Sequence, residues 1–265
     1  MRRPALVLLL GMSLSLSGGP ADVFRWSSDL ESFIDQVGRR IQEAPALTDW
    51  SARIRSDSRR MDGKWKPKTI TVVEKTVTVR KGVMTEEIHR ATEEKKGRVR
   101  DITKKMAAEA AIARAKARRK SEKEGSKEGG RDHSRQFTLS MRDAIPFLPE
   151  NRDQYEFRFA PDEEWNKKPV RVVEVRAVSP SDRRMEGAFR IDPESFDILQ
   201  AELRPSKKRS VLKRFEMTVL FTRLPTGQLV LGETRVKIHV GLVIKNIRVE
   251  AHEVYSDYRI LTDIR

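Results

Sequence analysis

The segment 187–207, GAFRIDPESFDILQAELRPSK, constrains the fold most, because it has the complete pattern of a β-hairpin. Apolar and polar residues alternate on both sides of the four residues Asp192-Pro193-Glu194-Ser195. Asp accepts backbone hydrogen bonds at the first position of a turn, and Pro presets φ at the second. The chain therefore contains at least one antiparallel strand pair with a defined turn.

The same two-residue period recurs along most of the chain, which predicts an antiparallel sheet with one apolar face. Alternating runs begin at Asp49, at Tyr155 and at Phe215, and the last of these continues to Tyr258 across the turn at 224–227. The period slips by one residue at Val72-Val73 and again at Val172-Val173. Such slips are typical of β-bulges, which let a sheet bend, so we expect a strongly curved sheet.

One amphipathic helix is expected before the first strand. Ser28 followed by Glu31 fits a capping box, and Pro45 ends the run. The residues expected on its apolar face are Leu30, Phe33, Ile34, Val37 and Ile41. This helix either closes an ordinary core or acts as a lid over the sheet, and the apolar stripe is the same in both cases.

A second helical segment is expected at about 93–135, where alanine, lysine, arginine and glutamate dominate before Gly125, Gly129 and Gly130. Its apolar positions are mostly alanine, whose burial stabilises little per turn. Between 98 and 131 there are twelve Lys and Arg against five Asp and Glu, within a net charge of +15 for the whole chain. Such a helix docks on an anionic membrane surface or an envelope protein, or is simply a solvated charged helix.

The first 21 residues have the pattern of a secretory signal peptide. Arg2 and Arg3 precede an apolar run at 5–10, and Gly19-Pro20-Ala21 offers small residues for cleavage near Ala21. The run is interrupted by serines, which makes it too short for a membrane span. We expect an exported, periplasmic protein with one domain at 22–265, with an uncleaved anchor as the alternative.

The hairpin, together with the strands that follow it to Tyr255-Ser256-Asp257-Tyr258-Arg259, resembles the LolA/LolB-like family of periplasmic outer-membrane lipoprotein-sorting proteins. The resemblance spans about 155–265 and is weaker at 49–92. It implies an α+β fold, a half-β-barrel with a helix across its concave face, and a hydrophobic ligand on that face. The basic helical segment departs from the compact carriers of the family.

An apolar concave face cannot stand empty, because a dry cavity of about 300 Å³ would cost roughly 7 kcal/mol. The N-terminal helix, an acyl chain, or both in exchange must fill it. For each candidate lining residue, ordinary core packing is the competing interpretation. The candidates are Phe157, Phe159, Phe189, Ile191, Leu203, Phe215, Met217, Val219 and Phe221.

Several other functions lack support in the sequence. Cysteine is absent, which excludes disulfides, thiolate catalysis and a lipid-acceptor cysteine in this chain. The run Asp132-His133-Ser134 has the residue types of a hydrolase triad, but adjacent residues cannot converge on one substrate atom, and no nucleophile elbow is present. His239 and His252 have no carboxylate at metal-like spacing. The basic helix lacks interleaved aromatic residues, which argues against nucleic acid.

The sequence therefore predicts a non-enzymatic envelope protein without a cofactor or metal. It is expected to bind a lipid, a lipoprotein acyl chain or another apolar ligand. The alternative is a sensor or protein-docking module that has the same fold and carries no lipid.

Overall fold

The computed structural model describes residues 28–43, 47, 49–81, 83–124, 145–181, 184–207, 210–241 and 246–261. The expected signal peptide and the run Asp132-His133-Ser134 lie outside these residues. The helices are α1 (Ser28–Glu43), α2 (Thr103–Glu124) and α4 (Pro149–Arg152). The strands are β1 (Trp50–Met61), β2 (Pro67–Arg80), β3 (Val83–Lys95), β4 (Arg98–Asp101), β5 (Tyr155–Phe159), β6 (Glu163–Trp165), β7 (Lys168–Ala177), β8 (Met185–Ile191), β9 (Ile198–Pro205), β10 (Leu212–Arg223), β11 (Leu229–Gly241) and β12 (Asn246–Ile260).

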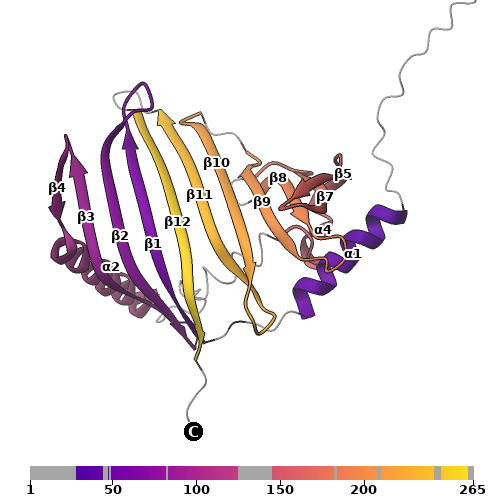
Figure 1. Ribbon diagram of the computed structural model, residues 1–265, viewed down its shortest axis with the longest axis horizontal. Coiled ribbons are helices and arrows are strands. Elements are labelled where there is room, and N and C mark those ends of the chain that lie inside the picture. The colour runs from indigo at the N-terminus through magenta and orange to yellow at the C-terminus, as the bar shows by residue number, and fades with distance from the viewer. Residues whose placement is uncertain are drawn as a thin grey trace, which may run out of the picture.

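The strands form one open antiparallel sheet in the order β4-β3-β2-β1-β12-β11-β10-β9-β8-β7-β5, with β6 added on β7. Figure 1 shows the strands fanned and twisted across the molecule, with β4 near one edge and β5 near the other. Neighbours in the sheet are neighbours in the chain except at two places. There, β5 pairs directly with β7, and β12 returns to lie between β11 and β1.

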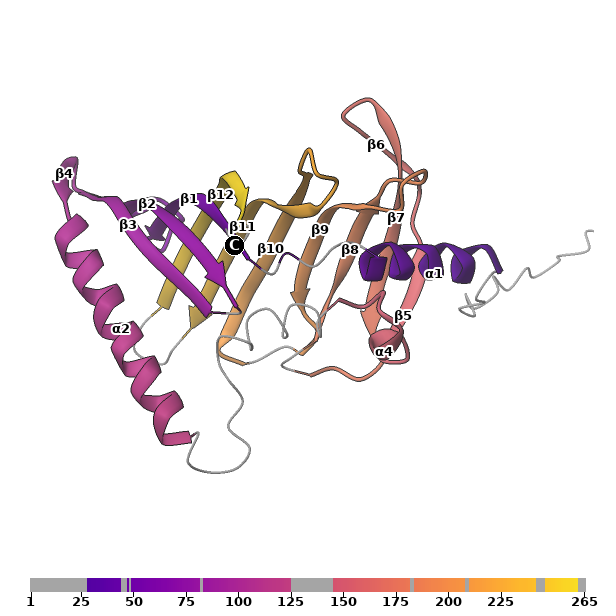
Figure 2. The ribbon, with the colours of Figure 1, turned by 90° about the horizontal axis from the view of Figure 1, so that it is seen from below.

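Both long helices lie on the same face of the sheet, which we call the inner face. Directly opposed residues on antiparallel strands share a face. Val219, which packs in the core with α1, is linked in register through Thr234, Glu253 and Ser56 to Val73. Ser56 and Val73 lie beneath α2. Figure 2 shows the two helices at opposite ends of the sheet.

The expected hairpin is present as β8 and β9. The Asp192 carboxylate accepts hydrogen bonds from the backbone N–H groups of Glu194 and Ser195 at 2.8 and 3.1 Å. In β8, Gly187 adjoins the β9 backbone so closely that a Cβ there would lie 1.8 Å from the carbonyl oxygen of Glu202. Only glycine fits at this position of the hairpin.

The two expected bulges are absent from the positions where the sequence slips. β2 pairs continuously through Val72 and Val73, which point to opposite faces, and β7 pairs continuously through Val172 and Val173. Register shifts occur instead in β3 at His89 and in four other strand pairs, β1–β12, β1–β2, β10–β11 and β8–β9. The adjacent valines of β7 reflect burial on both faces of the sheet rather than an extra residue, and those of β2 are half-buried on each face.

The expected helix at 93–135 begins ten residues later than predicted. Residues 93–95 complete β3, and 98–101 form the short strand β4. Lys96 and Gly97 both have positive φ, 54° and 72°, as a two-residue hairpin turn requires. Thr103 then starts α2, and the Asp101 carboxylate accepts a hydrogen bond from its N–H at 2.8 Å.

Candidate functional site

Helix α1 closes one half of the inner face, over β5 and β7–β9. Leu30, Ile34 and Val37 are buried in one core with side chains of these strands and with Phe147. Gly38 lets the α1 backbone lie directly against the backbone at Phe147, since a Cβ at this position would lie 2.6 Å from the carbonyl oxygen of Phe147. We call this region the closed half.

Ion pairs hold α1 against the closed half. Arg40 contacts the carboxylate of Asp197 at 3.0 Å, and Arg223 of β10 pairs with the same carboxylate. The Asp197 side chain is only 7% exposed. Asp35 pairs with Arg152 at the end of α4. A charge as deeply buried as Asp197 is tolerated only with such partners.

Most of the lining residues predicted from the sequence lie in or against the core of the closed half. Four are fully buried in it, namely Phe157, Phe189, Ile191 and Val219. Four are partly buried at its margin, namely Phe159, Leu203, Met217 and Phe221. Phe215 lies beyond this core on β10. Of the expected helix face, Leu30, Ile34 and Val37 are buried in the core, and Phe33 and Ile41 pack against it.

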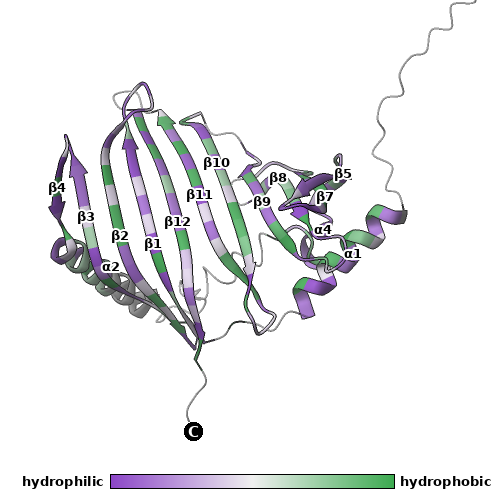
Figure 3. Cartoon of the chain, viewed as in Figure 1, coloured by the Kyte–Doolittle hydropathy of each residue, from purple (hydrophilic) through white to green (hydrophobic). Residues whose placement is uncertain are grey.

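The inner face continues beyond the closed half as an apolar strip over β10, β11 and β12. Its members face one another across the strand pairs and are half-buried, and Met217 alone among the six packs against the core beneath α1. Figure 3 shows the alternation of apolar and polar residues along these strands. We define the apolar strip as Phe215, Met217, Val236, Ile238, Val249 and Ala251.

A groove lies next to the strip, beneath α2. Its volume is about 460 Å³, which is within the range of small-molecule sites. The sheet side consists of Ser56, Ser58, Thr71, Val73, Lys75, Glu86 and Ile88, and the helix side of Met106, Glu109, Ala110 and Ala113. The strip and the groove together form what we call the open half.

The groove has a polar component as well as an apolar one. Lys75 forms an ion pair with Glu86 at 2.7 Å, and the Lys75 side chain is 19% exposed. Ser56 and Ser58 add hydroxyl groups, and Glu109 adds a carboxylate from α2. An amphipathic molecule matches such a lining better than a pure hydrocarbon does.

Two tyrosines of β12 border the open half. The Tyr255 hydroxyl donates to Glu253 at 2.9 Å, and the Tyr258 hydroxyl donates to the backbone carbonyl of Leu231 at 2.7 Å. Burial raises the pKa of both hydroxyls well above that of free tyrosine, and the Glu253 carboxylate raises the pKa of Tyr255 further. Both side chains are therefore neutral hydrogen-bond donors at ordinary pH.

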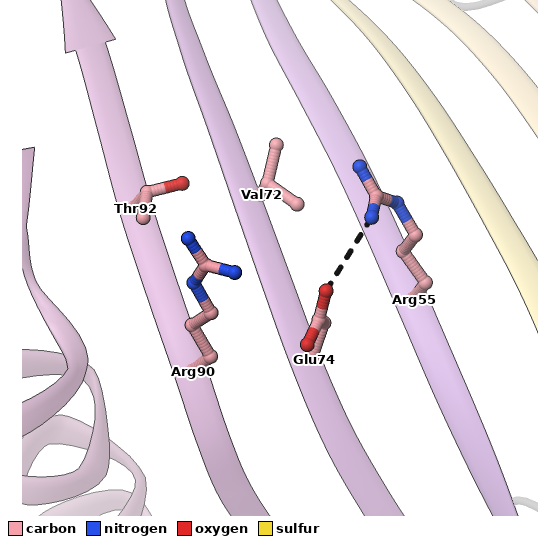
Figure 4. A pocket seen from close by; sticks show the side chains of 5 residues that line it. All are labelled: Arg55, Val72, Glu74, Arg90 and Thr92. Atoms are coloured by element: carbon pink, nitrogen blue, oxygen red, sulfur yellow. Dashed lines mark hydrogen bonds and ion pairs between the residues drawn. The ribbon is translucent and has the colours of Figure 1, made fainter. Parts of the chain in front are cut away.

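The outer face has a smaller hollow of about 130 Å³, between β1, β2 and β3. Figure 4 shows Arg55, Glu74 and Arg90 around it, with Val72 and Thr92 completing the lining. Arg55 pairs with Glu74 at 3.4 Å. The hollow is polar and has room for water or a small ion, so it does not fit an acyl chain.

Among the described residues, no cluster of three or more acidic or histidine side chains is placed to hold a metal ion. His252 contacts Glu233 at 2.6 Å, and His239 lies edge-on to Trp65, so these two histidines have different partners. No helix within the described ranges has the length and apolar character needed to cross a membrane.

The groove residues were missed by the sequence analysis. Ser56, Thr71 and Lys75 share a face with Val73. They are polar, and only apolar residues were considered as candidates for lining the concave face. Met106 lies in the segment that was predicted to be helical, but nothing in the sequence tells which strands this helix faces. The alternation in β2 was the one signal in the sequence that could have placed Thr71, Val73 and Lys75 on the same face.

No protein-family model and no curated protein matches this sequence. Its structure is similar to an outer-membrane lipoprotein-sorting protein domain from Vibrio parahaemolyticus, at 12% identity over 89% of this chain and 94% of that one, with a TM-score of 0.39. It is also similar to a DUF1329 family protein from Desulfovibrio piger, at 12% identity over 89% and 94% of the two chains, with a TM-score of 0.37.

A LolA superfamily protein from Nitrosomonas europaea is similar at 10% identity over 88% of this chain and 93% of that one, with a TM-score of 0.36. At such identities and TM-scores, no binding property of these proteins is transferred to this chain. Members of the family that the sequence resembles are thus among the solved structures to which this chain is similar, and the similarity concerns the fold alone.

Proposed function

We propose that this protein is an exported, non-enzymatic binding protein that holds an acyl lipid, or the acyl chain of a lipoprotein, in the open half of its inner face. The observation that supports this proposal is the continuity of the half-buried apolar strip with the groove beneath α2. Soluble proteins seldom expose contiguous apolar patches larger than a few hundred Å², except where something binds.

The ligand is amphipathic in this proposal. Its hydrocarbon chain lies along the strip, where Phe215, Ile238 and Val249 offer side chains from three neighbouring strands. Its polar end lies in the groove, where Lys75 can pair with an acidic group and the serine hydroxyls can donate hydrogen bonds. Burial of each methylene group stabilises the complex by about 0.8 kcal/mol.

Helix α2 is the element that moves for the ligand. Among the side chains of α2 that the structure describes, Thr103, Met106, Ala107 and Ala110 are half-buried and none is fully buried, so lifting this part of the helix exposes little apolar area. Helix α1, which the sequence offered as a lid, contributes three fully buried side chains and two ion pairs to the closed half. Its displacement would open a core, so we assign α1 to the core and α2 to the cover.

Native mass spectrometry of the chain, purified without detergent from the compartment to which it is exported, tests the proposal. A stoichiometric lipid that is released by organic extraction is the expected result. Phe215→Glu should abolish lipid retention, whereas Thr222→Glu, on an exposed position of the same strand, should preserve it.

Phe215→Glu can fail to fold, so Met106→Glu on α2 provides a second variant at the other wall of the groove. Its circular dichroism should match that of the parent chain while its lipid content falls. A folded parent chain that carries no lipid, and that binds no fluorescent fatty acid, would overturn the proposal and favour a docking or sensor module on the same fold.

A further inference from the structure

Positive charge is concentrated at one end of the sheet, which we call the basic tip. It consists of residues 62–68, 94–98, 212–214, 239–241 and 246–248. Strand register brings these segments together, since Met61 pairs with Arg248, Thr69 with Lys95, and His239 with both Arg214 and Arg248. In Figure 1 the tip is the upper end of β1, β2, β11 and β12.

The tip contains nine Lys and Arg against two carboxylates, Asp62 and Glu94, a surplus of seven positive charges. The Asp62 carboxylate is occupied within its own turn, where it accepts the backbone N–H groups of Lys64 and Lys66 at 2.8 and 2.9 Å. The opposite end of the same strands, at 49–51, 79–84, 221–231 and 259–261, has four Lys and Arg against Asp49, a surplus of three.

Trp65 lies at the centre of the tip, between the exposed side chains of Lys64 and Lys66. Its φ of 59° lies in the left-handed region, and its indole lies over the ends of β10, β11 and β12, against Arg214, His239 and Arg248. The guanidinium groups of Arg214 and Arg248 lie 5.4 and 6.0 Å from the ring centre. The indole is half-buried, so one part of it reaches solvent among cations.

We propose that the basic tip docks on the surface of a membrane that contains anionic phospholipids. Each Lys or Arg held near such a surface contributes about 1 kcal/mol to binding, and tryptophan prefers the headgroup region, where its ring is apolar and its N–H is solvated. The cations come from the ends of several strands and spread across one end of the molecule, which suits a flat surface better than a single phosphate.

Nucleic acid and acidic proteins are the competing partners. Nucleic-acid binding by stacking uses several aromatic rings, and Trp65 is the one aromatic residue in these segments apart from His239. The proposal is independent of the acyl ligand, because the tip and the groove are lined by different residues. Docking at the tip would nevertheless leave the open half beside the membrane.

Sedimentation with vesicles of phosphatidylcholine, with or without about 30% phosphatidylglycerol, tests the docking. The parent chain should bind only the anionic vesicles and should dissociate in high salt, because surface charge is screened within about 10 Å at 0.1 M. Lys64→Gln/Lys66→Gln should lower the partition coefficient roughly 25-fold, about fivefold for each lysine. Trp65→Ala should lower it by about fivefold at every salt concentration.

The matched control is Arg80→Gln/Arg259→Gln, which removes the same charge from exposed positions at the opposite end. It should change the partition coefficient by about twofold or less. Equal losses in the two double variants would overturn the proposal in favour of non-specific attraction. Tighter binding to DNA or to polyglutamate than to anionic vesicles would also overturn it.

Phe215→Glu separates this test from that of the proposed function. If the strip binds lipid and the tip docks, this variant loses lipid and keeps vesicle binding. If the tip does not dock, the lysine variants retain their lipid and the parent chain does not sediment with vesicles.

Discussion

The closed and open halves of the inner face have the same alternating strands and different helices over them. Helix α1 places Leu30, Ile34 and Val37 against the closed half, where all three side chains are buried. Helix α2 places Met106 and alanines against the open half and leaves a groove of about 460 Å³. The size of the side chains on the covering helix therefore decides which half is a packed core and which half keeps a groove.

The largest expected effect is that of Gly187→Ala in the closed half. The new Cβ would lie 1.8 Å from the carbonyl oxygen of Glu202, so the β8–β9 pair must separate. We expect a loss of about 3 kcal/mol or more in unfolding free energy, measured by urea denaturation followed by circular dichroism. Gly232→Ala in β11 meets its nearest atom, the Cβ of Thr222, at 3.4 Å and should lose less than about 1 kcal/mol. Similar losses in the two variants would show that the close contact between β8 and β9 does not require glycine.

Truncation of the two covering helices sharpens the comparison. Ile34→Ala creates a cavity in the core beneath α1 and should lower the unfolding free energy by about 3 kcal/mol. Met106→Ala removes a half-buried side chain from α2 and should cost less than about 1 kcal/mol. Equal costs in the same denaturation assay would mean that α2 is as much a part of the core as α1.

The ion pairs of the two halves should differ in the same direction. Asp197→Asn leaves Arg40 and Arg223 without their shared carboxylate in a buried site and should cost about 2 kcal/mol. Glu86→Gln breaks the pair with Lys75 at the more exposed floor of the groove and should cost less than about 1 kcal/mol. Thermal unfolding of the two variants measures the difference, and a larger effect at Glu86 would count against it.

The smallest effect at neutral pH is expected from the tyrosines. Burial raises the pKa of Tyr155 in the closed half and of Tyr255 and Tyr258 in the open half, so the folded state favours the neutral phenol. This contribution is fully present below the unfolded pKa of about 10 and is lost as the pH rises above it. Phenolate absorbance should therefore appear late and together with unfolding. Ionisation of two tyrosines near the pKa of free tyrosine, without loss of structure, would show that the hydroxyls of Tyr255 and Tyr258 on β12 are exposed to solvent.

Much of the fold could be predicted from local patterns. The β8–β9 hairpin follows from alternation around Asp192-Pro193, and the strands from 212 to 260 follow from the same period. Errors occurred where two local signals compete. At 98–101 the charged residues and the later helix suggested helical structure, but the turn at Lys96-Gly97 pairs this stretch with β3.

The site was only partly predictable, because its location depends on long-range pairing. The alternation shows that Phe157 and Phe215 each lie on an apolar face, but it does not show that α1 covers one and not the other. The groove itself is formed by β1, β2, β3 and α2, which are close in the sequence. Its continuity with the strip depends on the pairing of β1 with β12, for example Met61 with Arg248, across some two hundred residues of sequence.

The position of β12 also has a consequence for the order of synthesis. β12 joins β1 on one side and β11 on the other, so it is the junction between the strands from the first part of the chain and those from the second. Until Asn246–Ile260 has emerged, β1 and β11 both present a long unpaired edge, and such edges recruit other chains. The sheet can therefore become continuous only after Asn246–Ile260 has been synthesised, long after β1 has left the ribosome.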